Sequence, residues 1–203
     1  MITAILIIII VCIAFFFFYK FIFLRDNKNK IPSGHNIVSP ASGRIVSIQE
    51  INNQSSLQIR KGFFGKIETF LDAGESYFLI NIFMNPWDVH IQKMPIDGTI
   101  LNIEQTPGKF RPVMTLDAGL ENEKQEFLIQ TEIGKIKVIQ IAGFLARRNR
   151  SFVQIKQALK KGEHLGIILL GSQTALIFPK KNITLQVKVG DVVSSGETIL
   201  CNL

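Results

Sequence analysis

The first 24 residues constrain this chain more than any other feature, because they form an almost unbroken apolar run. Between Met1 and Leu24 only Thr3 and Lys20 fall outside the apolar set. As a helix, Ile2 to Leu24 would be roughly 34 Å long, which is enough to cross the hydrocarbon core of a bilayer. No face of the segment is polar, so the buried core helix of a soluble protein is a poor interpretation. We therefore predict a transmembrane helix that serves as a membrane anchor.

The residues around this run favour a retained anchor and predict its orientation. A cleaved signal peptide usually has a basic start and small residues at its cleavage point, whereas this segment begins without Lys or Arg and ends in aromatic residues. Arg25, Lys28 and Lys30 follow it directly. Because basic residues next to a span favour the cytoplasmic side, we expect the rest of the chain on the cytoplasmic face of the cell membrane.

The sequence predicts three parts: a membrane anchor at residues 1–24, a polar linker at 25–35 and a β-rich domain at 36–203. The whole chain carries 23 Lys and Arg against 16 Asp and Glu, a formal net charge of +7. A solvated surface accounts for most of these side chains, and together they suit an anionic membrane surface. No zinc finger, recognition helix or basic motif interleaved with aromatics is present, so we predict no nucleic-acid partner.

Cysteine and histidine usage gives no sign of a metal site. Cys12 lies inside the predicted anchor and Cys201 lies near the other end of the chain, so the two cannot sensibly pair. The three histidines, at 35, 90 and 164, are scattered, and no Cys/His spacing resembles that of a metal site. We predict no metal.

Beyond the linker, alternating and continuous apolar runs separated by Gly and Pro predict a mainly β fold. The expected strands are Arg44–Gln49, Tyr77–Met84, Thr99–Glu104, Glu126–Thr131, Lys135–Ala142, Leu165–Leu170, Thr174–Phe178 and Ile183–Val189. Ser151–Lys161 is either the one helix of the domain or another strand with a Lys-rich turn. The pattern favours a sandwich or barrel-like arrangement that is α+β at most.

Two segments of the predicted domain resemble each other. Ser39–Ile45 and Met94–Ile100 each place a Pro, and a Gly three residues later, ahead of an apolar strand. Val187–Ile199 repeats this turn-then-strand arrangement with Gly190-Asp191 as its turn. Biotinyl- and lipoyl-carrier domains use similar turns, so the pattern alone does not name a function.

A Gly-Ser step lies between two apolar runs, at Gly171-Ser172. The structural interpretation is a bulge, since glycine inside a strand often marks one. The chemical interpretation is that a Gly before the hydroxyl lets Ser172 approach the preceding carbonyl, which permits an N→O acyl shift. Elimination can then leave a pyruvoyl group. Taken alone, the dipeptide favours the bulge.

Five ordered blocks change that balance. The run from Phe83 to Lys93 reads Phe-Met-Asn-Pro-Trp-Asp-Val-His-Ile-Gln-Lys and resembles the Phe-Met-Ser-Pro-Leu-Asp-Val-His motif of phosphatidylserine decarboxylase proenzymes. The other blocks are Arg25-Asp26 with Ile31-Pro32, Pro107-Gly108-Lys109-Phe110, Gln140–Arg148 and Gly171-Ser172. The resemblance runs from about Arg25 to Leu203 with these blocks in order, and it is closest to the short, single-anchor form of the family.

The resemblance implies self-cleavage between Gly171 and Ser172. A long β chain would stay paired, as a heterodimer, with a short α chain that begins at a pyruvoyl group derived from Ser172. That group would form a Schiff base with the amine of phosphatidylserine and accept electrons while CO₂ leaves, giving phosphatidylethanolamine. His90 matches the family histidine and would act as acid and base in both reactions. Arg147 and Arg148 are candidates for a lipid phosphate, although a solvated surface explains paired arginines equally well.

One position departs from the family pattern. The family's Ser-Pro-Ala-Asp-Gly block, whose Asp orients the histidine, has Ser42 in place of that Asp. Ser42 can accept a hydrogen bond from an imidazole N–H but supplies no negative charge. Asp88 and Asp97 are alternative partners for His90. The departure motivates a second hypothesis, an uncleaved, catalytically degenerate homologue that binds lipid or a partner at the membrane.

Overall fold

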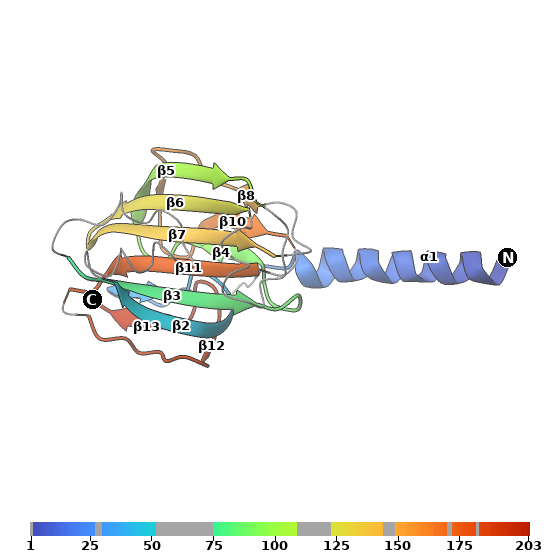
Figure 1. The fold of residues 1–203 in the computed structure, drawn as a ribbon, viewed down its shortest axis with the longest axis horizontal. Helices are drawn as coiled ribbons and strands as arrows, with labels where there is room; N and C mark the ends of the chain where they lie inside the picture. The colour runs from blue at the N-terminus through green and yellow to red at the C-terminus, as the bar shows by residue number, and fades with distance from the viewer. Residues whose placement is uncertain are drawn as a thin grey trace.

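The N-terminal apolar run forms a helix that projects from the β-rich body of the protein (Figure 1). The computed structural model describes residues 2–26, 30–51, 75–108, 123–143, 149–169, 172–181 and 183–203. An α-helix, α1 (Ile2–Phe17), continues directly into a π-helical segment, η1 (Phe18–Phe23). Residues Ile2–Phe21 are long and apolar enough to cross a membrane, with a mean hydropathy of 3.0 and none of the segment buried.

The described strands form an eight-stranded, a three-stranded and a two-stranded sheet, and every pairing is antiparallel. In spatial order, the large sheet contains β12 (Val192–Val193), β2 (Gly43–Ile51), β3 (Tyr77–Met84), β11 (Ser172–Pro179), β7 (Gly134–Ala142), β6 (Lys124–Thr131), β5 (Gly98–Thr106) and β9 (Ala158–Leu159). The smaller sheets contain β4 (Ile91–Lys93), β10 (His164–Ile168) and β8 (Asn149–Ser151), and β1 (Asn36–Val38) with β13 (Ile199–Asn202). The predicted mainly β class with one apolar N-terminal helix is confirmed.

The main core lies between one face of the large sheet and the smaller sheets. Ile80 and Leu176 from the large sheet belong to the same buried cluster as Met94 and Leu165 from the β4–β10 region. A second cluster, which includes Ile177, occupies the opposite face of the central strands. Because both faces of these strands are buried, their sequences are continuous apolar runs rather than alternating ones.

The large sheet consists of two similar halves. Read from either edge, its order is a two-residue strand, a nine-residue strand, an eight-residue strand and then a central strand. The two predicted turn-then-strand units occupy corresponding places in these halves and bond to each other. The Lys93 amide donates to the Pro40 carbonyl, and the Val38 amide donates to the Pro95 carbonyl, both at 2.9 Å.

Glycine is required where each of these units enters its strand. A Cβ atom at Gly43 would lie 2.1 Å from the carbonyl oxygen of Phe83, and one at Gly98 would lie 2.6 Å from that of Gln130. A side chain at either position would push β2 away from β3 or β5 away from β6. The repeated Pro-x-x-Gly spacing therefore reflects the same close strand approach in both halves.

The helix considered for Ser151–Lys161 is wrong, and the alternative of a strand with a Lys-rich turn is the better description. The segment contains the end of β8, turns and the short strand β9. Its backbone bonds to a neighbouring strand: the Ile100 amide donates to the Gln157 carbonyl, and the Lys156 amide donates to the Ile100 carbonyl. Lys156 also has a φ of 70°, which an α-helix does not allow.

The strand predicted at Ile183–Val189 is also wrong. In its described part the segment makes one isolated bridge, from Leu185 to Cys201. Its alternation nonetheless has a physical cause, because Ile183, Leu185 and Val187 pack against the main core while the residues between them are exposed. The alternation reflects one partly buried face, but the segment contacts β13 only through this bridge and the Gln186 amide, which donates to Leu200 at 2.8 Å, and it forms no ladder.

Candidate active site

Ser172 is the first residue of β11, at the end of the large sheet nearest the anchor. It pairs with Met84, the last residue of β3, and with Ala142, the last residue of β7. The arrows of β3 and β7 point toward the anchor and that of β11 points away from it (Figure 1). Directly opposite residues in an antiparallel sheet share a face. Because Met84 and Ala142 belong to the main core, Ser172 lies on the face that is covered by the smaller sheets.

Three of the predicted site residues lie outside the described part of the chain. These are Gly171, Arg147 and Arg148, together with the end of the block that begins at Pro107. For Ser172 the backbone is described and the side chain is not. The site geometry is therefore built from His90, Ser42 and the backbone of β11.

His90 is completely buried just ahead of β4, and its ring has a defined hydrogen-bond partner. Its Nδ1 atom lies 2.8 Å from the backbone carbonyl oxygen of Asp88. A carbonyl oxygen can only accept, so Nδ1 must carry the proton that is donated. In the neutral ring, Nε2 is then the nitrogen without a proton, which is the state required of a general base.

The surroundings of His90 keep the ring neutral. The pKa of His90 is lowered from 6.5 to about 4, mainly because the charged form loses its hydration on burial, and the nearby charge of Arg25 contributes to the lowering. The Asp88 carbonyl and carboxylate oppose this shift and raise the pKa. At neutral pH the ring is therefore uncharged and its Nε2 atom can accept a proton.

We expect the His90 ring to titrate near pH 4 rather than near 6.5. Proton uptake at Nε2 removes the base, so any reaction that needs this base should slow only as the pH falls toward 4. Nitrogen NMR of ¹⁵N-histidine-labelled protein in detergent micelles measures the midpoint directly, and the His90→Gln variant identifies the signal by its loss. A midpoint near 6.5 would contradict the buried, neutral ring.

The chain connecting the two sheets brings the backbone of His90 close to the start of β11. The Ile168 amide, at the end of β10, donates to the His90 carbonyl at 3.3 Å. Ser172 follows only four positions later, and four peptide units span at most about 14 Å. The peptide bond between Gly171 and Ser172 is therefore part of a short connection that begins beside His90.

The Ser42 hydroxyl takes part in a buried turn that is connected to the residue after His90. Its Oγ atom accepts a hydrogen bond from the Ser195 amide at 3.0 Å. The Ser195 hydroxyl in turn lies 3.0 Å from the Pro40 carbonyl and 3.1 Å from that of Ile91. Ser42 thus helps to hold the backbone that carries His90.

Asp97 occupies the position in the other half of the sheet that corresponds to Ser42. Its carboxylate accepts the Lys161 amide at 2.7 Å, just as Ser42 accepts the Ser195 amide, and pairs with the Lys160 ammonium at 2.8 Å. The Lys160 hydrogen bond is the main cause that lowers the pKa of Asp97. The hydrogen bonds of the Asp97 carboxylate are therefore made to its own turn. The comparison also indicates that this type of turn accommodates either Ser or Asp.

Asp88 is the group that contacts the His90 ring, but it does so through its backbone carbonyl. Its carboxylate accepts the Asn85 amide at 2.7 Å and closes the turn from Asn85 to Asp88. The sequence pointed to the Asp88 side chain as an alternative partner. In the structure, the side chain shapes the turn that aims the carbonyl at His90.

A row of buried polar side chains beside the start of β11 was not predicted. The Met84 sulfur accepts hydrogen bonds from the Gln92 side chain at 3.6 Å and from the Thr174 hydroxyl at 3.5 Å. The side-chain amide of Gln140 donates to the side-chain oxygen of Gln92 at 2.6 Å. All four residues are fully buried. Thr174 shares its face of β11 with Ser172, so the row lines the site on one side. Polar residues within otherwise apolar strands were the signal that could have identified it.

Comparison with known proteins identifies relatives that match most of the chain. A "Putative archaetidylserine decarboxylase proenzyme" of Methanocaldococcus jannaschii is 34% identical over 88% of this chain and 86% of its own length. A "Phosphatidylserine decarboxylase proenzyme" of Wolbachia pipientis is 37% identical, over 89% and 74% of the two chains. The corresponding protein of Chlorobaculum tepidum is 31% identical, over 88% and 74%. A family model described as phosphatidylserine decarboxylase matches residues 14–201.

The chain belongs to the phosphatidylserine decarboxylase family. The resemblance predicted from the five sequence blocks is confirmed. Within this family, the protein combines a Ser at position 42 with a histidine whose Nδ1–H is donated to a backbone carbonyl. A carboxylate is therefore not needed at position 42 to fix the tautomer of His90.

Proposed function

We propose that this protein is a membrane-tethered, pyruvoyl-dependent phosphatidylserine decarboxylase that matures by cleavage between Gly171 and Ser172. The observation that carries the proposal is the buried, neutral His90, whose protonated Nδ1 leaves Nε2 as a base near the start of β11. Membership in the decarboxylase family gives the reaction its class, a carboxy-lyase.

In maturation, the Nε2 atom of His90 takes the hydroxyl proton of Ser172 as its oxygen attacks the Gly171 carbonyl carbon. The peptide C–N bond breaks and an ester forms in its place, with the proton returned to the departing nitrogen. In the elimination that follows, a base removes the Cα proton of residue 172, the electron pair forms the Cα=Cβ bond, and the Cβ–Oγ bond breaks to leave a carboxylate on Gly171. The remaining dehydroalanine takes up water and releases ammonia, which gives the pyruvoyl group.

The residues around the start of β11 fit that group. Thr174, Gln140 and Met84 form a buried, hydrogen-bonded wall behind it. When present, the pyruvoyl carbonyl binds the substrate amine covalently and accepts the electron pair that CO₂ leaves behind. His90, protonated during the reaction, would then supply the proton to the decarboxylated carbon. Arg147 and Arg148 remain our predicted contacts for the lipid phosphate.

The fold explains how the two chains would stay together after cleavage. The short chain, residues 172–203, would contain β11, β12 and β13. β11 lies between β3 and β7, with hydrogen-bonded partners on both sides, while β12 pairs with β2 and β13 with β1. Every strand of the short chain is therefore paired to the long one. This interleaving supports a heterodimer held without a covalent bond.

The anchor would keep the enzyme at its lipid substrate. Arg25 and Lys30, at the end of the anchor, favour a cytoplasmic location for the domain by the positive-inside bias. The net charge of +7 suits a leaflet that contains anionic phosphatidylserine. We therefore place the domain on the cytoplasmic side of the cell membrane.

SDS gels of the purified protein test this proposal against the alternative of an uncleaved, degenerate homologue. We expect the natural chain to separate into two bands and to convert phosphatidylserine in vesicles to phosphatidylethanolamine. Ser42→Asp should fold, because Asp97 occupies the corresponding turn, and should raise the cleavage rate by no more than about 10-fold, or 1.4 kcal/mol of added imidazolium stabilisation. Cleavage that occurs only in the Ser42→Asp variant would establish the degenerate homologue instead.

A further inference from the structure

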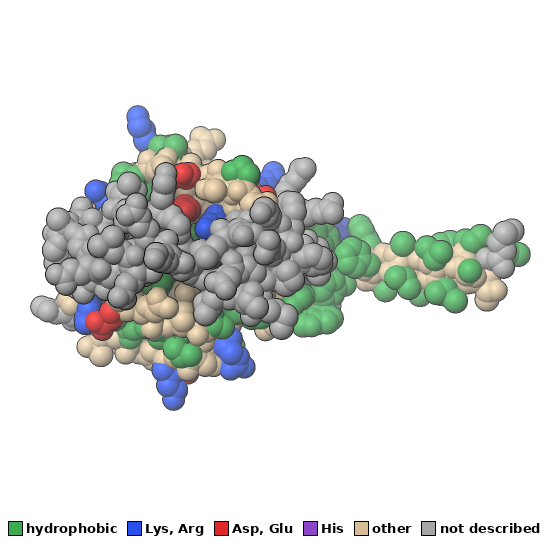
Figure 2. Space-filling view, in the orientation of Figure 1, with side chains coloured by type: hydrophobic (Ala, Val, Ile, Leu, Met, Phe, Trp, Pro, Cys, Tyr) green, Lys and Arg blue, Asp and Glu red, His purple; other side chains and the backbone are tan. Residues whose placement is uncertain are grey.

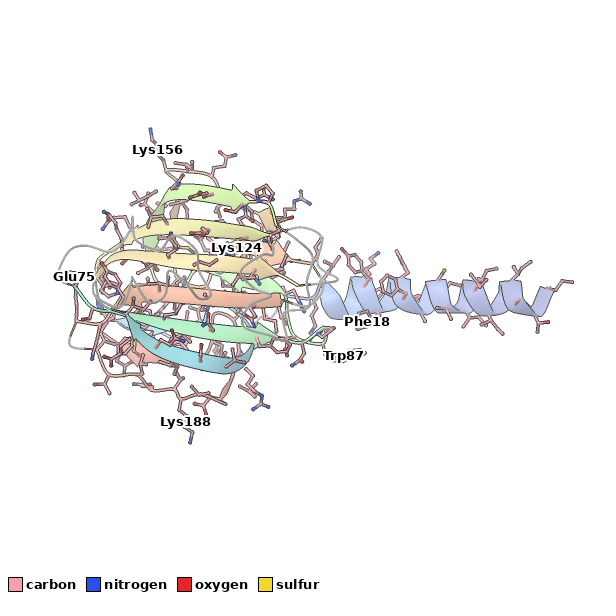
Figure 3. The ribbon with its side chains drawn as sticks, viewed as in Figure 1. Phe18, Glu75, Trp87, Lys124, Lys156 and Lys188 are labelled. Atoms are coloured by element: carbon pink, nitrogen blue, oxygen red, sulfur yellow. The ribbon has the colours of Figure 1, made fainter. Side chains whose placement is uncertain are left out.

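The end of the anchor and the residue that follows it contact the part of the domain that carries His90. The Phe18 ring packs edge-on against the Trp87 ring, with centroids 4.8 Å apart. The Arg25 guanidinium donates to the backbone carbonyl of Trp87 at 2.5 Å. Figure 3 shows Phe18 and Trp87 close together at the end of the helix that meets the domain. The turn that ends two residues before His90 is thus attached to the anchor.

Asp26 provides the second attachment. Its carboxylate lies 3.1 Å from the Lys93 ammonium and 2.9 Å from Nε2 of His164. The Lys93 side chain is only 4% exposed, so its charge has little water around it and depends on being paired. Hydrogen bonds from Lys93 and His164 lower the pKa of Asp26, although its partial burial opposes them. We call the neighbouring residues Arg25 and Asp26, with these contacts, the clasp.

The clasp places an exposed Trp next to the end of the membrane span. Trp87 is 64% exposed, although Trp has the largest of the apolar side chains. Phe152, which is 44% exposed, has its ring centroid 6.2 Å from that of His164, the residue that pairs with Asp26. Figure 2 shows hydrophobic side chains gathered where the helix meets the domain. Trp is enriched at the level of the lipid head groups, where the end of a transmembrane helix lies.

We propose that the clasp holds the domain against the lipid bilayer so that the Asn85–Asp88 turn, with the Trp87 ring, lies among the lipid head groups. The partner of this surface is the bilayer itself, because the surface is continuous with the span and is fixed to it by the Phe18 and Arg25 contacts. A lipid head group then reaches the His90 end of the sheet by lateral movement, without leaving the membrane. This last consequence rests on the proposed function, whereas the docking of the surface does not.

Trp87 is the single Trp of the chain, so its fluorescence reports on this surface alone. The full-length protein is reconstituted in phosphatidylcholine vesicles with phosphatidylglycerol, and the acyl chains are brominated close to the head group in a parallel sample. We expect the brominated lipid to quench Trp87 strongly and aqueous iodide to quench it weakly. Strong iodide quenching with no effect of bromine would overturn the proposal, since the ring would then face water or another protein.

Asp26→Asn tests the role of the clasp. Loss of the carboxylate charge should loosen the domain and raise the iodide quenching constant of Trp87 by about 3-fold or more, as its ring leaves the interface. The matched control is Glu50→Gln, which removes an exposed ion pair with Lys180 at 2.6 Å in the half of β2 far from the site. Unchanged quenching in Asp26→Asn, with bromine quenching still strong, would overturn the clasp.

These readouts are independent of catalysis. If Asp26→Asn does not fold, the comparison of bromine and iodide quenching in the unaltered chain still decides whether the surface meets lipid. If the protein proves to be uncleaved and inactive, the proposed function fails while the fluorescence result stands. Conversely, an active, cleaved enzyme whose Trp87 is open to iodide refutes only the docking.

Discussion

Replacing Ser172 with alanine should abolish both self-cleavage and decarboxylation. Alanine has no hydroxyl to attack the Gly171 carbonyl, so the peptide bond stays intact and no pyruvoyl group forms. Without that group the reaction falls back toward the uncatalysed rate, a loss of at least about 10⁶-fold. SDS gels would show one full-length band, and release of labelled CO₂ from phosphatidylserine would fall to background.

A matched serine at the opposite end of the sheet serves as the control. Ser76 directly precedes β3, and its carbonyl accepts the Lys180 amide. Glu75, its neighbour, is labelled at the end of the domain farthest from the anchor (Figure 3). Ser76→Ala should leave both bands and the activity unchanged. Two bands from Ser172→Ala would mean that the chain is cleaved elsewhere, and would contradict the site.

Replacing His90 with glutamine should slow self-cleavage by about 10²- to 10⁴-fold, the usual contribution of a positioned general base. Glutamine can still donate to the Asp88 carbonyl, but its other polar atom cannot take up a proton at neutral pH. The half-life of the full-length band after cell-free synthesis measures the effect without requiring active enzyme. Any mature protein that accumulates should also be slow in decarboxylation, since the same nitrogen supplies the proton there.

His35 offers the matched control for this variant. It lies just ahead of β1 as His90 lies just ahead of β4, and its carbonyl accepts the Leu203 amide as that of His90 accepts the Ile168 amide. Its side chain, however, is 78% exposed. His35→Gln should therefore cleave at the normal rate. Equal rates for His90→Gln and the unaltered chain would remove His90 from the mechanism.

The sequence predicted most of the fold because the burial of each strand is recorded in its own residues. The continuous run Tyr77–Met84 corresponds to a strand buried on both faces, and the runs flanking Gly171-Ser172 correspond to β10 and β11. The errors arose where the structure of a segment depends on the strands elsewhere in the chain to which its backbone can hydrogen-bond. Ser151–Lys161 bonds to Ile100 across the sheet, and the alternating segment Ile183–Val189 has a partly buried face but makes only an isolated bridge to β13.

The candidate site was predictable only in its residue types. The block around His90 and the Gly-Ser step predicted an acid/base histidine and a cleavage point, and the His90 carbonyl accepts the amide of Ile168, four positions before Ser172. That the Asp88 carbonyl, and not a side chain, fixes the ring tautomer depends on how the turn folds. The role of Ser42 depends on Ser195, which is far away in sequence, and becomes clear only beside the corresponding contact of Asp97.

The intact mass of the chain that begins at position 172 tests the central claim most directly. The account predicts a fragment that ends at Leu203 and weighs less, by one molecule of ammonia, than the same peptide with an N-terminal serine. This mass records the position of the cleavage and the conversion of Ser172 to a pyruvoyl group at once. A single species at the full-length mass, or a fragment that retains an N-terminal serine, would contradict it.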